Sequence, residues 1–213
     1  MGYSLSWIAT RGLASEEVQQ LLGIRAIAKG SPVPSSSCTA AQLENGWHVV
    51  FFASSCDVVD RSAKALLAQA PEAITCFVEE HVMASGAAAW KDGRTIWAVE
   101  HESEQGIYHL KIQGSPPDSL AQIASASRAL QEAGGGESAD VDHTFDVPVD
   151  LAESLVGFHH DKTYEHGGND PWFVCEMPHT SPKAIIRKSG CLPLLLLGGL
   201  ILAGIIAQHS TTH

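Results

Sequence analysis

The C-terminal part of the chain contains 19 consecutive residues, 189–207, without a charged side chain. As a helix this run would be about 28 Å long, close to the hydrocarbon core of a bilayer of about 30 Å. The alternative is a buried C-terminal helix of a globular domain, but such a helix keeps a polar face, and this run is apolar on every side. The sequence therefore predicts a single transmembrane helix at residues 189–207, followed by a short tail at residues 208–213.

The residues that flank this span predict its orientation. The tail holds no Lys or Arg, whereas residues 177–188, a basic juxtamembrane linker, hold three: Lys183, Arg187 and Lys188. Basic residues stay on the cytoplasmic side of a span. The first 20 residues contain two glutamates and no long apolar run, so they do not resemble a secretory signal. We therefore expect a single-pass membrane protein with its N-terminal domain in the cytoplasm.

Small residues recur at every fourth position of the predicted span, at Gly199, Ala203 and Ala207. Such a stripe allows two transmembrane helices to approach closely, which would give a homodimer. Small residues are also common in spans that do not associate, and this second interpretation is favoured.

Residues 1–176 have the composition of one soluble, acidic domain. The whole chain is 45% hydrophobic and 17% charged, which is enough apolar side chain for a core. Against 13 Lys and Arg stand 24 Asp and Glu, a formal net charge of -11 that argues against nucleic-acid binding. The five cysteines are odd in number and never spaced C-x-x-C, so we expect reduced thiols and neither a disulfide framework nor a zinc ribbon.

Turn signals predict several hairpins. Asn45-Gly46 and Asp92-Gly93 each stand between apolar runs and favour two-residue turns. Residues 107–112 and 141–147 are predicted strands, residues 119–133 a helix, and Asp150 the N-cap of a helix over residues 151–156, whereas residues 159–182 show no regular pattern. Hairpins outnumber crossovers, which favours an α+β fold with a mostly antiparallel sheet and helices on one face over a doubly wound parallel fold.

The densest group of candidate metal ligands follows this last helix. Its histidines are His159, His160 and His166, with acids and Cys175 nearby. No pair of them has the spacing of a zinc motif, so a metal site is not favoured and no cofactor is predicted. Two further triplets, residues 79–81 and 100–102, place carboxylates beside a histidine, but adjacent strand residues point to opposite faces and solvated side chains are favoured.

Negative charge is concentrated late in the domain. Residues 130–176 contain 11 acidic residues and one base, Lys162. The favoured interpretation is a solvated face that anionic lipid repels. The functional interpretation of the same charge is that it steers a basic partner protein toward this face.

Five short stretches resemble those of small bacterial proteins of no assigned activity, over residues 3–160. They are residues 79–83 (Glu-Glu-His-Val-Met), 92–94 (Asp-Gly-Arg), 106–110 (Gly-Ile-Tyr-His-Leu), 139–142 (Ala-Asp-Val-Asp) and 145–148 (Phe-Asp-Val-Pro). The resemblance implies a bacterial cytoplasmic origin and no particular activity, and the hydrophobic C-terminus is an addition to the shared pattern.

These observations favour a membrane-tethered cytoplasmic binding protein over an enzyme. Its concrete form is an inhibitor or immunity-type protein for a basic partner. The expected partners also include the bilayer, through residues 189–207, and they do not include nucleic acid. The alternative is a membrane-tethered, metal-dependent hydrolase that uses the region from His159 to His166. A third hypothesis is a structural membrane protein that dimerises through its span.

Overall fold

The structure, a computed structural model, describes residues 2–29, 37–53, 56–162 and 172–177, with side chains of helix α2 from residue 63 onward. None of the described helices combines the length and apolar character needed to cross a membrane. The predicted span and tail and most of the linker lie outside these residues. With them lie the residues on which topology, helix packing and part of the metal hypothesis rest: His166, Lys183, Arg187, Lys188, Gly199, Ala203 and Ala207.

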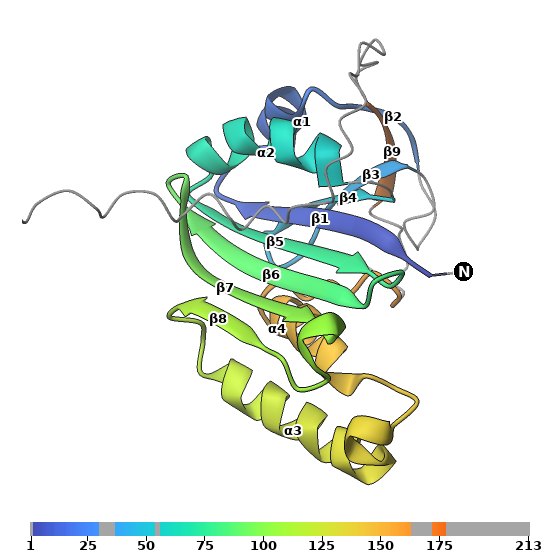
Figure 1. The fold of residues 1–213 in the computed structure, drawn as a ribbon. Helices are drawn as coiled ribbons and strands as arrows, with labels where there is room; N and C mark the ends of the chain where they lie inside the picture. The colour runs from blue at the N-terminus through green and yellow to red at the C-terminus, as the bar shows by residue number, and fades with distance from the viewer. Residues whose placement is uncertain (1, 30–36, 54–55, 163–171, 178–213) are drawn as a thin grey trace, which may run out of the picture.

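The described residues form an α+β fold around one antiparallel sheet (Figure 1). Its nine described strands lie in the order β2-β9-β3-β4-β1-β5-β6-β7-β8. The strands are β1 (Ser4–Arg11), β2 (Arg25–Lys29), β3 (Cys38–Gln42), β4 (His48–Phe52), β5 (Glu72–Glu79), β6 (Ala84–Lys91), β7 (Arg94–Glu102), β8 (Lys111–Gly114) and β9 (Trp172–Glu176). The prediction of a mostly antiparallel sheet is confirmed.

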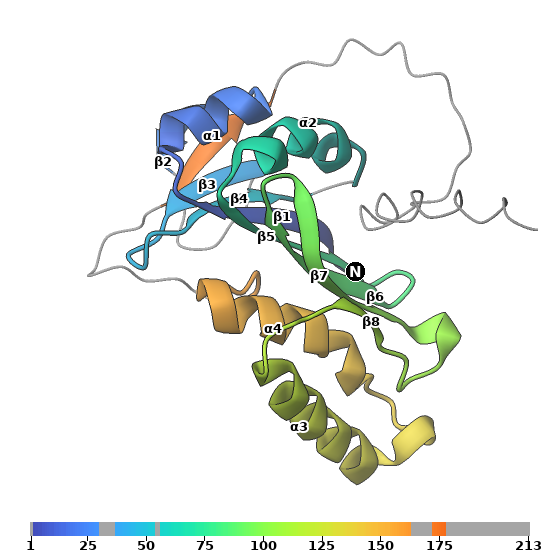
Figure 2. The ribbon, with the colours of Figure 1, turned by 90° about the vertical axis from the view of Figure 1, so that its left-hand side faces the viewer.

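Helices cover both faces of this sheet (Figure 2). On one face lie α1 (Ser15–Leu22) and α2 (Cys56–Gln69), and on the other lies α4 (Val147–Val156), which α3 (Ser119–Gly134) covers in turn. Short 3₁₀ turns complete the list of helical segments: η1 (Ser103–Gln105), η2 (Gly136–Ser138) and η3 (His143–Asp146).

The predicted placement of helices on one face was therefore wrong. The central strands have apolar residues at successive positions, so that both faces of the sheet need a cover. In β1, Trp7 belongs to the core on the α4 side and Ile8 to the core on the side of α1 and α2, and both are fully buried. All five residues of β4 are buried as well. Such unbroken runs of buried residues are typical of strands between two layers.

Both predicted hairpins are present, but only one has the predicted two-residue turn. The connection between β3 and β4 spans residues 43–47; Gly46 has a φ of 87°, whereas Asn45 does not have the positive φ that the predicted turn requires. Between β6 and β7, Asp92 and Gly93 have φ values of 49° and 74°, which is the conformation of a turn whose twist matches that of the strands. The dipeptides therefore predicted where both hairpins lie, but the type of turn correctly only at Asp92-Gly93.

Two predicted elements differ. The alternating residues 107–112 contribute only their last two residues to β8. The predicted strand 141–147 is instead η3 and the first residue of α4, because the Asp142 carboxylate accepts hydrogen bonds from the backbone N–H groups of Thr144 and Phe145 and starts a helical turn. Helix α4 therefore begins before Asp150, whereas the predicted helix 119–133 is α3.

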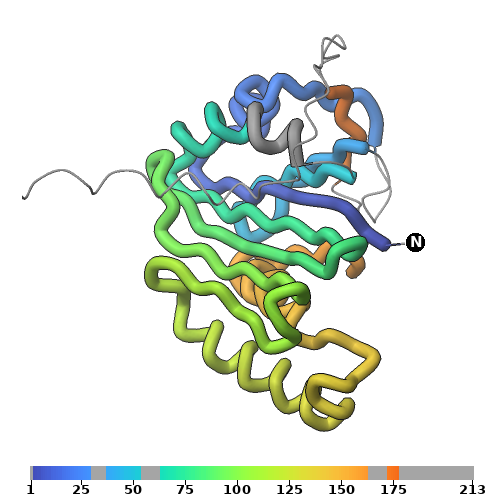
Figure 3. Tube along the Cα trace, viewed as in Figure 1, coloured from blue at the N-terminus to red at the C-terminus, as the bar shows by residue number. Residues whose placement is uncertain are grey.

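The last described strand, β9, was not predicted. It lies between β2 and β3, so that the end of the described chain pairs with two strands near its beginning (Figure 3). Trp172 of this strand is fully buried, and its ring centroid lies 5.2 Å from that of Phe158. Strand β9, from the opposite end of the described chain, therefore completes the sheet between β2 and β3.

Candidate functional site

The C-terminal end of α4 positions the first predicted site residues. Gly157 ends the helix with a φ of 74°, and the buried Phe158 follows. The Phe158 ring meets Trp7 edge-on at 5.5 Å between centroids, which anchors the loop against the sheet. His159 and His160 come directly after this anchor, so their backbone is held in place.

Two carboxylates of α4 lie next to His159. Asp150 and Glu153 are three residues apart on the helix and therefore share a face. One ligand atom from each of Asp150, Glu153 and His159 lies within 4.8 Å of the other two. A set of two carboxylates and one imidazole suits a first-row divalent cation.

Two further groups complete what we call the α4 cluster: Asp150, Glu153, His159, Asp161 and Lys162. The Lys162 ammonium donates to both carboxylate oxygens of Glu153, at 2.7 and 2.6 Å. Nδ1 of His159 forms an ion-pair contact with the Asp161 carboxylate, and the imidazole is only 9% exposed. The cluster thus already binds one cationic group of the chain, an ammonium held by a carboxylate.

His160 does not join this group. Its ring stacks on His159 with 4.8 Å between centroids and meets Tyr3 edge-on. Burial and the neighbouring His159 lower the pKa of His160 to about 4. Of the three predicted histidines, the structure places His159 beside acidic ligands and His160 against an aromatic ring, and His166 lies outside the described residues.

Asp150 and Glu153 were not predicted as partners of His159. The sequence predicts Asp150 as a helix N-cap and Glu153 only as one of the acidic residues of this region. A signal was present: two carboxylates at helical spacing, followed by a glycine stop and a histidine six residues after Glu153.

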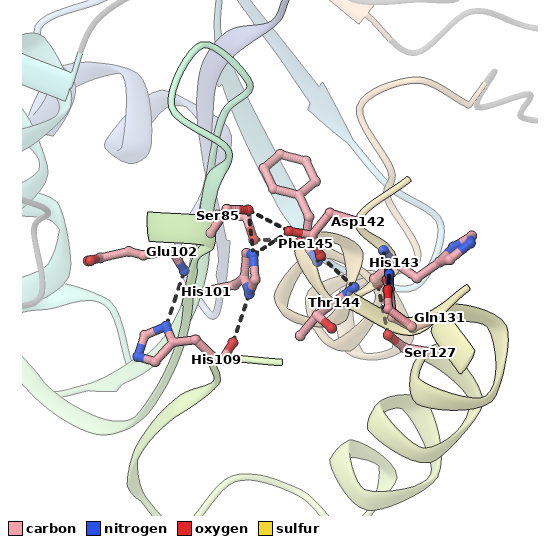
Figure 4. Close-up of polar contacts among 12 residues, drawn as sticks. Ser85, His101, Glu102, His109, Ser127, Gln131, Asp142, His143, Thr144 and Phe145 are labelled. Atoms are coloured by element: carbon pink, nitrogen blue, oxygen red, sulfur yellow. Dashed lines mark hydrogen bonds and ion pairs between the residues drawn. The ribbon is translucent and has the colours of Figure 1, made fainter. Parts of the chain in front are cut away.

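A second polar cluster lies at the end of β7, under α3 and η3 (Figure 4). His101 is fully buried; its Nδ1 lies 2.7 Å from the backbone oxygen of His109, and its Nε2 lies 3.0 Å from Asp142 Oδ2. Ser103 Oγ donates to the same Asp142 oxygen and lies 3.1 Å from Nε2 of His101. These contacts join β7 to the segment that precedes η3.

His101, Ser103 and Asp142 are the three residue types of a Ser-His-Asp catalytic triad, but their arrangement differs from that of a triad. In a catalytic triad the two ring nitrogens separate the nucleophile from the carboxylate. Here Ser103 and Asp142 both face Nε2, and the serine hydroxyl donates to the carboxylate rather than to the ring. We therefore interpret this cluster as a structural clamp.

Neighbouring hydrogen bonds support that interpretation (Figure 4). Ser127 Oγ donates to the backbone oxygen of His143 at 2.8 Å, and Gln131 Oε1 accepts from the His143 N–H at 2.8 Å. Ser85 Oγ donates to the backbone oxygen of Phe145 at 2.6 Å. The polar groups thus connect α3 and β6 to η3.

The prediction that residues 100–102 are solvated was wrong for two of them. Glu100 is 2% exposed and His101 0% exposed. Glu100 lies opposite Lys111 of β8, whose ammonium donates to Oε2 at 2.6 Å, so an ion pair accompanies burial of the carboxylate. In the other triplet, the His81 side chain is 63% exposed, as predicted.

Of the two clusters, only the α4 cluster combines partial exposure with closely placed ligand atoms. The α4 cluster is therefore the candidate functional site. No protein-family model, curated protein or solved structure matches this chain.

Proposed function

We propose that this chain is a membrane-tethered binding protein whose helical layer of α3 and α4 docks a basic partner protein, as an inhibitor or immunity-type protein would. The observation that carries the proposal is the charge of that layer. Residues 115–162, which contain α3, η2, η3 and α4, hold nine carboxylates against Arg128 and Lys162. Five of the carboxylates form what we call the acidic layer: Glu132, Glu137, Asp140, Asp146 and Asp150.

The electrostatics of the acidic layer favour an external cation. Partial burial raises the pKa of Asp146, and the charge of Asp150 raises it further. Partial burial is also the main cause that raises the pKa of Asp150. A raised carboxylate pKa means that the ionised form is destabilised in the folded protein. Basic groups of a partner would relieve that destabilisation and attract the partner at long range.

The test is an affinity experiment on the full-length protein in detergent. The immobilised protein is exposed to host cytosolic extract, and the retained protein is identified, purified and titrated by calorimetry. The test variant is Asp140→Asn/Asp146→Asn. The matched control, Glu16→Gln/Asp92→Asn, removes the same charge from α1 and from the turn near α2.

We expect a basic partner whose affinity falls with added NaCl and is roughly tenfold weaker for the test variant, because two charge contacts are lost. The control variant should bind like the wild type. Equal weakening by both variants, a neutral or acidic partner, or no retained protein at all would overturn the proposal.

The tether itself is proposed from residues 189–207, which bind the bilayer as a single span with the folded domain in the cytoplasm. Support comes from the length and apolar character of the run and from the basic residues before it. Full-length protein should stay in the membrane pellet after alkaline washing. Leu196→Arg/Ile201→Arg should release it, because each arginine costs about 3 kcal/mol on insertion. Release of the unchanged protein would contradict the tether.

A second candidate, a metal-dependent hydrolase, is favoured by one observation: the proximity of Asp150, Glu153 and His159. A divalent cation held by these residues would supply an activated water and polarise a substrate carbonyl or phosphoryl oxygen. Asp161, in contact with His159 Nδ1, would orient the imidazole as a second ligand shell does.

Zinc titration of the full-length protein distinguishes this candidate. We expect one ion per chain bound at the cluster, lost in Asp150→Asn and in His159→Gln, and retained in the control His81→Gln, which removes an exposed histidine also paired with a carboxylate. Lys162→Gln should tighten zinc binding, since it removes the competing ammonium. Unchanged zinc binding by His159→Gln would exclude the cluster as the site.

A further inference from the structure

Two cysteines face each other across neighbouring strands, in the core on the opposite face of the sheet from α4. Strands β3 and β9 are antiparallel, with Thr39 opposite Val174 and Ala40 opposite Phe173. Extending this register by one residue places Cys38, the first residue of β3, opposite Cys175 of β9. The two residues are 137 positions apart in the chain but are direct neighbours in the sheet.

The geometry of an antiparallel pair suits a disulfide. Directly opposite residues have Cα atoms about 4.5 to 5.5 Å apart and side chains on the same face. A disulfide requires a Cα separation of about 4.4 to 6.8 Å. Cys38 and Cys175 also belong to the same buried core, on the side of α1 and α2, and are 0% and 4% exposed.

The two thiols interact with each other. A hydrogen bond from Cys38 lowers the pKa of the Cys175 thiol. The same interaction, together with burial, raises the pKa of Cys38. Cys175 is therefore the member of the pair that ionises first, and a thiolate is the nucleophilic form of cysteine.

Cys76, the third described free cysteine, provides a contrast. It is as deeply buried as Cys175, but its neighbours across the sheet are Trp7 and Ala87. Burial raises the pKa of its thiol far above the usual value for cysteine. It thus lacks both a facing thiol and an activating hydrogen bond.

We propose that Cys38 and Cys175 are a redox-sensitive modification site, at which a peroxide converts two thiols into a reversible disulfide between β3 and β9. The reaction does not depend on the proposed docking function. The thiolate sulfur of Cys175 attacks one peroxide oxygen and the O–O bond breaks, which gives a sulfenic acid and hydroxide. The Cys38 sulfur then attacks the sulfenic sulfur, and water leaves.

The electron balance is complete. Two thiols lose two electrons and two protons, and hydrogen peroxide takes them up to form two waters. A dithiol reductant reverses the step by thiol–disulfide exchange. In the reduced protein β9 is held by noncovalent contacts, which include backbone hydrogen bonds, packing and the Arg25–Glu176 ion pair, whereas in the oxidised protein a covalent bond joins it to β3.

The test uses the full-length folded protein treated with hydrogen peroxide, alkylated and digested without reductant. Trypsin is combined with a glutamate-specific protease, because cleavage after Glu44 separates Cys38 from Cys56. Mass spectrometry should find a Cys38–Cys175 peptide that dithiothreitol removes. Cys76→Ser should still form it, whereas Cys38→Ser should not.

A second measurement does not depend on any variant. Hydrogen exchange in the wild-type protein should be slower at residues 172–176 after oxidation and should return to its original rate with dithiothreitol. The proposal is overturned if folded protein keeps Cys38 and Cys175 reduced under peroxide that oxidises a small dithiol standard. It is also overturned if the disulfide joins other cysteines.

Discussion

At the scale of single residues, the most consequential polar group outside the clusters is His48 at the start of β4. It is 3% exposed, its Nδ1 lies 3.1 Å from Ser15 Oγ, and its Nε2 has no hydrogen-bond partner. Burial lowers its pKa to about 4, against the opposing charge of Glu16. The folded state therefore holds this ring in its neutral form.

This pKa predicts acid destabilisation. A histidine with a pKa lowered on folding contributes stability that is present above pH 6.5 and is lost as the pH falls toward 4. Between pH 7.5 and pH 5 the loss for His48 is about 2 kcal/mol. Urea unfolding at the two pH values should show this loss in the wild type and a loss smaller by that amount in His48→Gln.

The exposed His81 supplies the control, because its side chain is 63% exposed. His81→Gln should still lose stability between pH 7.5 and pH 5, because His48 is unchanged in this variant. The pKa of His160 is lowered on folding, as that of His48 is. Some acid destabilisation should therefore remain in both variants. A wild-type stability independent of pH over this interval would contradict the buried, neutral state of His48.

At the scale of elements, the turns could be predicted and the long-range strand could not. Asp92-Gly93 has the backbone conformation that the dipeptide predicts, Asn45-Gly46 marks the position of its hairpin, and α3 shows an apolar periodicity. Strand β9 has only five residues, and its partners, β2 and β3, precede it by more than 120 residues. No local pattern indicates such a pairing, so residues 172–176 were predicted to be irregular structure at the end of the soluble domain.

The candidate site was predicted only in part for the same reason. The histidines after α4 were visible as a dense run, but His159 meets Asp150 and Glu153 only because Gly157 turns the chain and Phe158 anchors it under Trp7. Likewise, the burial of His101 depends on Asp142, 41 residues later, and could not be deduced from the triplet 100–102.

The contribution of β9 to the stability of the fold leads to a second prediction. Trp172 is fully buried against Phe158, whereas its neighbour Phe173 is 43% exposed. Trp172→Ala should lower the free energy of unfolding by roughly 3 to 5 kcal/mol, as expected for a large buried side chain. Phe173→Ala should cost less than about 1 kcal/mol.

Urea denaturation of the two variants provides the comparison. Two equal, small losses would mean that β9 contributes little to the core and would remove the structural basis for a covalent link between β3 and β9.

At the scale of the whole molecule, the excess of negative charge lowers the stability of the folded state. The net charge is -11, and the carboxyl groups of Asp146 and Asp150 both have raised pKa values. A carboxylate whose pKa is raised on folding binds its proton more strongly in the folded state. Stability is therefore lost as the pH rises through the folded-state pKa, and the destabilisation is complete at neutral pH.

A third prediction follows for Asp150→Asn. At pH 7 and low salt the variant should be more stable than the wild type, by up to about 1 kcal/mol, since a poorly compensated charge is removed. The difference should shrink near pH 4 and at high salt, where protonation or screening has the same effect. Thermal unfolding across this range of conditions measures it.

Glu153→Gln is the matched control on the same helix, because Glu153 binds Lys162 through both oxygens. Its loss removes a favourable pair and should not stabilise the protein. If both variants lower the stability of the protein equally, nearby cations compensate the charge of Asp150, and the prediction is wrong.

The insertion of β9 between β2 and β3 also has a consequence for synthesis on the ribosome. The chain emerges from its N-terminus, so β2 and the outer side of β3 are made long before the segment that pairs with them. During that interval their backbone groups face water, and they can pair with another nascent chain on the same messenger. The sheet can be completed only after residues 172–176 are translated. Early chaperone release or slow elongation before this point would therefore favour misassembly.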